Sequence, residues 1–165
     1  MNALKKPVWR VPLVLGCTGL LCRALTFILG FAWGTMQRLR GPGPDGTTVL
    51  TSGYVTEIAA VISFLLFWLA GWRFVRGLTR REIFLSATIM VLINAALLAA
   101  EQLSQAVGGY SLWVYRLYAL TEGTMWADQL LIRLFDTVSV PVLIPALFAP
   151  YLYLVFGRQR PFSAS

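Results

Sequence analysis

The chain has 165 residues, of which 58% are hydrophobic and 13% are charged, and its mean hydropathy is +0.70. This composition is too apolar for an ordinary water-soluble domain and predicts an integral membrane protein. The net charge of +7 would suit nucleic acid, but most basic residues flank apolar stretches, where topology and anionic lipids account for them. We therefore expect no nucleic-acid partner.

The residue inventory also disfavours several kinds of catalytic site. The chain has no histidine, which is the commonest metal ligand and the commonest general base at neutral pH. Its two cysteines, Cys17 and Cys22, are five residues apart in one predicted helix and point to different faces, so we expect no disulfide between them. No HExxH, GxSxG, phosphate-loop or paired-cysteine motif occurs. We expect neither a cofactor nor a metal.

Residues 11–36 form the first predicted membrane span, because about 20 apolar residues at about 1.5 Å each cross a bilayer core of roughly 30 Å. Arg23 lies near the middle of this span, where estimates of its cost run from about 2.5 to more than 10 kcal/mol, so it should face protein or water. Four glycines share its face: Gly16, Gly19, Gly30 and Gly34. This stripe predicts close helix packing, and Gly30 and Gly34 form a GxxxG pair.

Val14 to Cys17 resembles a lipoprotein cleavage box, but the apolar run before it is short, which favours an uncleaved helix.

Residues 54–72 are the second predicted span, after a turn-rich external loop at residues 37–53. Residues 73–82 follow as a connecting loop that carries four arginines, Arg73, Arg76, Arg80 and Arg81. The positive-inside rule places such a loop in the cytoplasm. With four spans in total, both termini then lie on the cytoplasmic side.

Residues 83–103 are the third predicted span, and Asn94, Glu101 and Gln105 fall on one of its faces. Residues 104–135 are too charged to cross a membrane and mix aromatic with charged side chains. We expect one or two amphipathic helices in the outer membrane interface. A re-entrant hairpin is the alternative.

Residues 136–156 are the fourth predicted span, with Asp136 as its N-cap. Pro141, Pro145 and Pro150 each remove a backbone donor, so this helix should be kinked. Broken helices build solute sites in some transporters, although proline is also simply more frequent in membrane helices than in soluble ones.

One polar cluster could carry a function. Counted along the spans, Arg23, Glu57, Asn94 and Glu101 fall in the middle and outer half of the membrane. We expect an ion pair between Arg23 and Glu57, with Asn94 beside it and Glu101 nearer the outer mouth. The cluster would bind a small polar or anionic solute or a headgroup, or it would only fix the helix register, at about 1 kcal/mol per contact.

The sequence thus predicts a single all-α membrane domain of four transmembrane helices, with general features that resemble small bacterial plasma-membrane proteins and no motif specific enough to name a family. The leading functional hypothesis is a non-enzymatic accessory subunit that contacts lipids and another membrane protein, or a second copy of itself. The alternative is solute or headgroup binding and transport. A lipid-modifying enzyme is the third hypothesis and requires that external carboxylates such as Glu122, Asp128 and Asp136 converge.

Overall fold

The computed structural model describes residues 7–41, 54–108, 113, 116–117 and 120–158. This part of the chain is all-helical and contains no strand, as the sequence predicts. Its elements are η2 (Pro7–Trp9), α1 (Arg10–Leu39), α2 (Val55–Ala70), η3 (Gly71–Val75), α3 (Arg80–Ala106), η4 (Glu122–Thr124), α5 (Met125–Phe135), α6 (Val140–Leu143) and η5 (Ile144–Phe156). Most of the predicted external loop at 37–53 lies outside the described residues.

Three helices are long and apolar enough to cross a membrane: α1, α3, and α2 together with the π-helical turn η3 that continues it. They cover the first three predicted spans. The start of α3 is set by a capping box, in which the Thr79 hydroxyl accepts from the Glu82 amide and the Glu82 carboxylate accepts from the Thr79 amide. Two otherwise unpaired amides are satisfied this way.

The fourth apolar segment differs from the predicted single α-helix. It consists of the short α6 and the 3₁₀ helix η5, and as an α-helix it would be too short to span a membrane. Pro145 and Pro150 have no backbone N–H with which to bond carbonyls four residues earlier, so the predicted disruption takes the form of a change in helix type. The predicted N-cap is wrong: Asp136 adopts a left-handed conformation (φ 48°) that ends α5, and the next helix begins at Val140.

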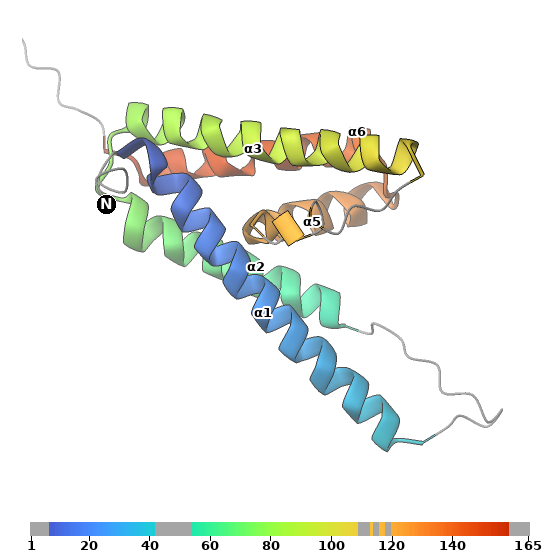
Figure 1. Cartoon of the computed structure of the whole chain (residues 1–165). Coiled ribbons are helices and arrows are strands. Elements are labelled where there is room, and N and C mark those ends of the chain that lie inside the picture. The colour runs from blue at the N-terminus through green and yellow to red at the C-terminus, as the bar shows by residue number, and fades with distance from the viewer. Residues whose placement is uncertain (1–6, 42–53, 109–112, 114–115, 118–119, 159–165) are drawn as a thin grey trace, which may run out of the picture.

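The helices form two antiparallel pairs, α1 with α2 and α3 with η5, which meet at one end and diverge toward the other (Figure 1). The core lies at the shared end, where Val11, Phe67 and Tyr153 are fully buried. Tyr153 of η5 stacks on Phe67 of α2 and donates a hydrogen bond to its carbonyl at 3.1 Å. Buried Ser86 of α3 accepts from the Val11 amide at 3.0 Å and so satisfies the start of α1.

The segment η4–α5, which we call the inserted segment, occupies the space between the two pairs (Figure 1). Its η4 part packs against α1 and α2, and its α5 part packs against α2. Gly123 makes the closest approach, because a Cβ there would lie 2.8 Å from Thr18 Oγ1 and 3.1 Å from the Leu15 carbonyl oxygen. Residues 121–135 therefore pack against α1 and α2, and both their interfacial and their re-entrant placement relative to a membrane stay predictions. Several residues of 109–119 lie outside the description.

The predicted glycine stripe divides along α1. Gly19 is buried with Gly123 close to its backbone, and Gly16 has Leu120 3.8 Å from an added Cβ, so Leu120 and η4 cover this half. Gly30 and Gly34 lie where α1 extends past the rest of the bundle, and no described residue comes within 4 Å of a Cβ at either position. Packing of this outer half against another helix therefore stays a prediction.

Candidate functional site

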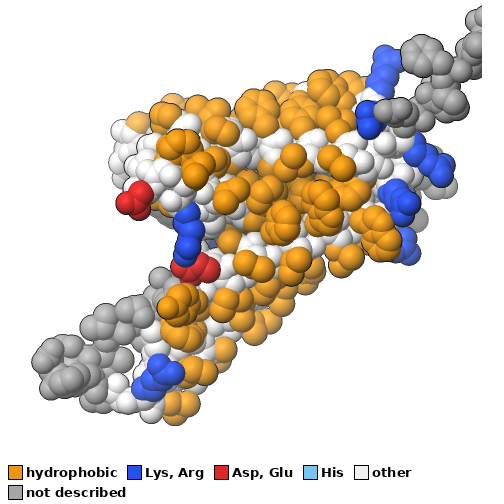
Figure 2. Space-filling model, turned by 180° about the vertical axis from the view of Figure 1, so that it is seen from behind, with side chains coloured by type: hydrophobic (Ala, Val, Ile, Leu, Met, Phe, Trp, Pro, Cys, Tyr) orange, Lys and Arg blue, Asp and Glu red, His pale blue; other side chains and the backbone are white. Residues whose placement is uncertain are grey.

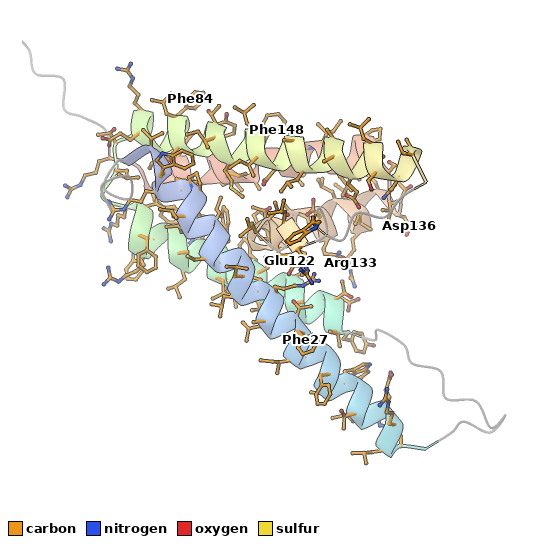
Figure 3. The ribbon with its side chains drawn as sticks, in the orientation of Figure 1. Phe27, Phe84, Glu122, Arg133, Asp136 and Phe148 are labelled. Atoms are coloured by element: carbon orange, nitrogen blue, oxygen red, sulfur yellow. The ribbon has the colours of Figure 1, made fainter. Side chains whose placement is uncertain are left out.

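Two ion pairs hold the inserted segment against the α1–α2 pair. Arg23 of α1 pairs with Glu122 of η4, and these side chains are 38% and 15% exposed. Glu57 of α2 pairs with Arg133 of α5 nearer the outer end, at 38% and 67% exposure. Figure 3 shows Glu122 beside α1 and Arg133 farther along α5. The two pairs differ mainly in how far they are shielded from solvent.

The tip of the inserted segment is also fixed through its backbone. Ser63 in the middle of α2 is fully buried, and its hydroxyl donates to the carbonyl oxygens of Glu122 at 3.1 Å and Gly123 at 3.3 Å. Ser63 is eight residues from the start of α2, so the tip reaches about 12 Å along that helix. The tip therefore lies deep between α1 and α2.

These contacts overturn the predicted Arg23–Glu57 pair. Each of the two residues takes a partner from the inserted segment, because that segment lies between the places where they would meet. The predicted four-residue cluster is consequently divided among three places: Arg23 with Glu122, Glu57 with Arg133, and Asn94 with Glu101 on the other side of the segment.

That other side contains a cavity of about 480 Å³ between α3, α5, α6 and η5. Asn94, Glu101 and Gln105 all line it, which agrees with the single face that their spacing predicts. The remaining polar lining residues are Gln102, Thr121, Thr124, Asp128 and Ser139, and none of the described lining residues is basic. The cavity is therefore rich in hydrogen-bond acceptors and carries two carboxyl groups.

Asn94 is the most informative of the lining residues. It is 4% exposed, and within the described part of the chain its Oδ1 has no hydrogen-bond partner. A buried acceptor without a partner costs about 1–3 kcal/mol, so native proteins rarely leave one unused. Asn94 thus combines an unused acceptor oxygen with a place in the lining of the cavity.

Asp128 lies on α5, outside the three candidate spans, and faces the same cavity. Burial raises the pKa of its carboxyl to about 7. Near neutral pH the group is therefore divided between a protonated donor and an ionised acceptor. Glu101 of α3 supplies the second carboxyl of the cavity.

Sequence reasoning named Glu122 and Asp128 only as external carboxylates and missed that Glu122 pairs with Arg23 and that Asp128 lines the cavity inside the bundle. A signal was present, since Glu122, Asp128 and Arg133 lie among apolar and aromatic residues, a pattern that buried ion pairs can also produce. The convergence that an enzyme would require is not seen: Glu122 pairs with Arg23, Asp128 lines the cavity, and Asp136 is exposed at the end of α5 (Figure 3). In the described residues, no group of three or more His, Cys, Asp or Glu side chains is placed to hold a metal.

No family model, curated protein or solved structure matches the chain. The function is therefore inferred from the side chains themselves.

Proposed function

We propose that this chain is a four-pass membrane protein that binds a small neutral or cationic polar solute in the cavity between α3, α5 and η5. The observation that carries the proposal is the buried, unpartnered Oδ1 of Asn94 in a cavity that also contains Glu101 and Asp128. This choice favours the solute-binding hypothesis over the accessory one. It also moves the binding site from Arg23 to the opposite side of the inserted segment.

Membrane insertion is supported by the surface. Phe27 and Phe31 of α1 are 74% and 71% exposed, which is unfavourable in water and favourable in lipid. Figure 2 shows apolar side chains over the middle of the molecule and most of the visible arginine side chains gathered at one end, with others toward the opposite end. An apolar band that ends in a basic rim is typical of a protein oriented with that rim in the cytoplasm.

A fourth crossing is supported by the geometry of a 3₁₀ helix. Such a helix rises about 2.0 Å per residue, so α6 and η5 together extend about 32 Å, which matches a bilayer core. Figure 1 shows η5 running back beside α3. After η5, the Arg158 amide donates to the Leu78 carbonyl, close to the start of α3. The Val8 carbonyl of η2, near the amino terminus, accepts from Ser86 at the same end of α3, and this favours both termini on one cytoplasmic side.

The chemistry of the cavity selects the solute class. Asn94 Oδ1 requires a donor from the ligand, and carboxyl groups at Glu101 and Asp128 attract positive charge and repel anions. A volume of about 480 Å³ suits a small organic molecule. Arg23 no longer favours an anion, because its charge is already paired with Glu122.

Thermal unfolding of the detergent-purified protein tests this proposal. The probes are choline, spermidine and glycerol, with acetate and phosphate as anionic controls. Binding to the folded state alone raises stability by about 2.7 kcal/mol at a hundredfold excess over the dissociation constant. We expect stabilisation by a cationic or neutral probe that is lost in Asn94→Leu and kept in Gln37→Leu, a similar change near the end of α1. Stabilisation by anions only, or an equal loss in both variants, would contradict the proposal.

The number of crossings is tested separately with reporter proteins fused to the two termini. Four crossings place both reporters on one side of the membrane, and three crossings place them on opposite sides. Fractionation of membranes after carbonate washing checks insertion itself. Reporters on opposite sides would contradict the fourth crossing and would leave the proposal of a solute-binding cavity unaffected.

A second candidate function is self-association through the outer half of α1. The open Gly30 and Gly34 favour it, because a GxxxG pair lets two copies of one helix approach closely. Gly30→Ile should then abolish a cross-linked dimer in membranes, while Leu39→Ile, at the exposed end of the same helix, should leave it intact. A monomer for the parent protein would exclude this function.

A further inference from the structure

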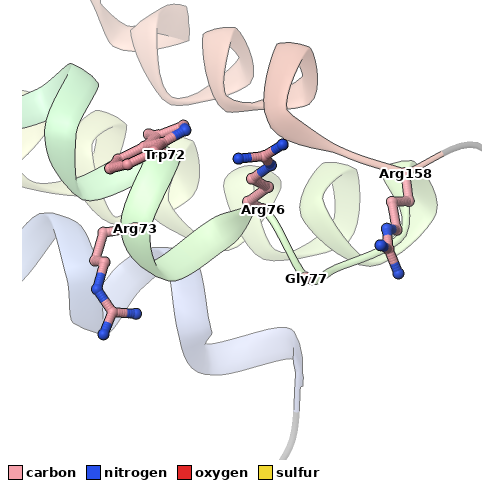
Figure 4. A pocket seen from close by; sticks show the side chains of 5 residues that line it. All are labelled: Trp72, Arg73, Arg76, Gly77 and Arg158. Atoms are coloured by element: carbon pink, nitrogen blue, oxygen red, sulfur yellow. The ribbon is translucent and has the colours of Figure 1, made fainter.

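A hollow of about 470 Å³ lies at the basic end of the molecule and shares no lining residue with the polar cavity; Figure 4 shows it from close by. Trp72, Arg73, Arg76, Gly77 and Arg158 line it. Three of these five residues are arginines, each with a positively charged guanidinium group. The hollow therefore concentrates positive charge in a concave site, which suits a compact anion.

Segments distant in sequence build this hollow. Trp72 and Arg73 lie in η3, and Arg76 follows it directly. Arg158 arrives from the end of η5, where its amide donates to the Leu78 carbonyl at 3.0 Å and its carbonyl accepts from the Arg80 amide at 3.3 Å. These backbone bonds bring Arg158 to the hollow that Arg73 and Arg76 also line, and Figure 4 shows the three side chains extending in different directions around it.

The three arginines are available to a ligand. All are exposed, and among the described residues no acidic side chain forms an ion pair with them. The nearby acid, Glu82, is occupied by the capping box with Thr79. Guanidinium groups bind phosphate oxygens in a two-pronged geometry, so a phosphate group fits this site better than a carboxylate of lower charge.

An apolar hollow continues from the basic one. It measures about 430 Å³ and is lined by Phe64, Leu65, Trp68, Leu69 and Trp72. These residues recur every three or four positions, so they follow one face of α2 and its continuation η3 over about 12 Å. Trp72 lines both hollows, as tryptophan does where headgroups meet acyl chains.

We infer that this end of α2 is a binding site for an anionic phospholipid, with the phosphate between Arg73, Arg76 and Arg158 and an acyl chain along Leu65 and Leu69. A free phosphate would use only the basic hollow, whereas a phospholipid uses both. The inference depends on the proposed membrane insertion and is independent of the solute cavity. It goes beyond the general attraction of basic loops to anionic membranes, because it names the arginines that bind.

Native mass spectrometry of the detergent-purified chain, titrated with phosphatidylglycerol, tests the basic hollow. Loss of a charge-assisted contact corresponds to about a tenfold weaker affinity, which we expect for Arg76→Gln and for Arg158→Gln. Arg81→Gln is the matched control, because it removes the same charge at the same end outside this hollow, and we expect less than a twofold change. Equal losses in all three variants would show diffuse attraction and overturn the site.

A second arm identifies the source of the phosphate. Leu69→Asn should weaken phosphatidylglycerol binding, whereas Leu92→Asn, on an exposed face of α3 away from both hollows, should not. Inorganic phosphate should compete only at concentrations far above those of the lipid. Equal competition by inorganic phosphate, or no effect of Leu69→Asn, would overturn the lipid assignment. Failure of insertion would instead appear in the carbonate-washed fractions.

Discussion

Arg23 and Glu122, which are 99 positions apart in the chain, form an ion pair that joins the middle of α1 to the tip of the inserted segment. The pair neutralises an arginine within a candidate membrane span, where an isolated charge would be costly. It also holds η4 between α1 and α2, and so places α5 against the cavity.

Glu122→Gln should lower the free energy of unfolding by about 1–3 kcal/mol, because it leaves a partly buried guanidinium without its carboxylate. Glu57→Gln is the matched control at the more exposed pair and should cost less than about 1 kcal/mol. Denaturant unfolding in detergent measures both values. A larger effect for Glu57→Gln would show that the outer pair is the main anchor.

Gly123→Ala should destabilise the protein by about 1–3 kcal/mol, since the new methyl group would meet Thr18 Oγ1 at 2.8 Å and the α1 backbone at 3.1 Å. Gly77→Ala introduces the same group into open space and should change stability by less than about 0.5 kcal/mol. Thermal unfolding of both variants checks the insertion of η4. Equal stability of the two variants would argue against this close approach.

Ser86→Ala should cost about 1–3 kcal/mol, because the buried Val11 amide at the start of α1 would lose its acceptor. Thr35→Val removes an exposed hydroxyl that bonds only within α1 at Phe31, so it serves as the control with a small effect. Hydrogen exchange at the first turn of α1 provides a local readout. Unchanged protection at Val11 in Ser86→Ala would contradict the capping role.

Asp128 should make stability depend on pH. Its folded pKa of about 7 lies above the unfolded value, so the folded state holds a proton that the unfolded state has released. The contribution of Asp128 to the free energy of unfolding should therefore be greatest below about pH 4. Between about pH 4 and pH 7 it should fall by at most about 1.4 kcal/mol per pH unit. Asp128→Asn should remove this slope, as measured by unfolding across that range. A slope of unchanged size in Asp128→Asn would contradict this role of Asp128.

The sequence by itself determined the features that depend on local periodicity and length. Three spans follow from runs of apolar residues, because the energy of burying them in lipid depends mainly on composition. The shared face of Asn94, Glu101 and Gln105 follows from the 3.6-residue repeat, and the unsuitability of Pro145 and Pro150 for a regular α-helix follows from their missing amides.

Only the tertiary structure decided which faces meet. Arg23 has several carboxylates within its possible reach, and nothing local to it distinguishes Glu57 from Glu122. The choice depends on residues 121–135 entering the bundle, which requires the close contact at Gly123 and the hydrogen bonds from Ser63. Such contacts join positions 59 or more residues apart, and their energies depend on the packing of all the helices at once, so no single stretch of the chain contains the information that selects them.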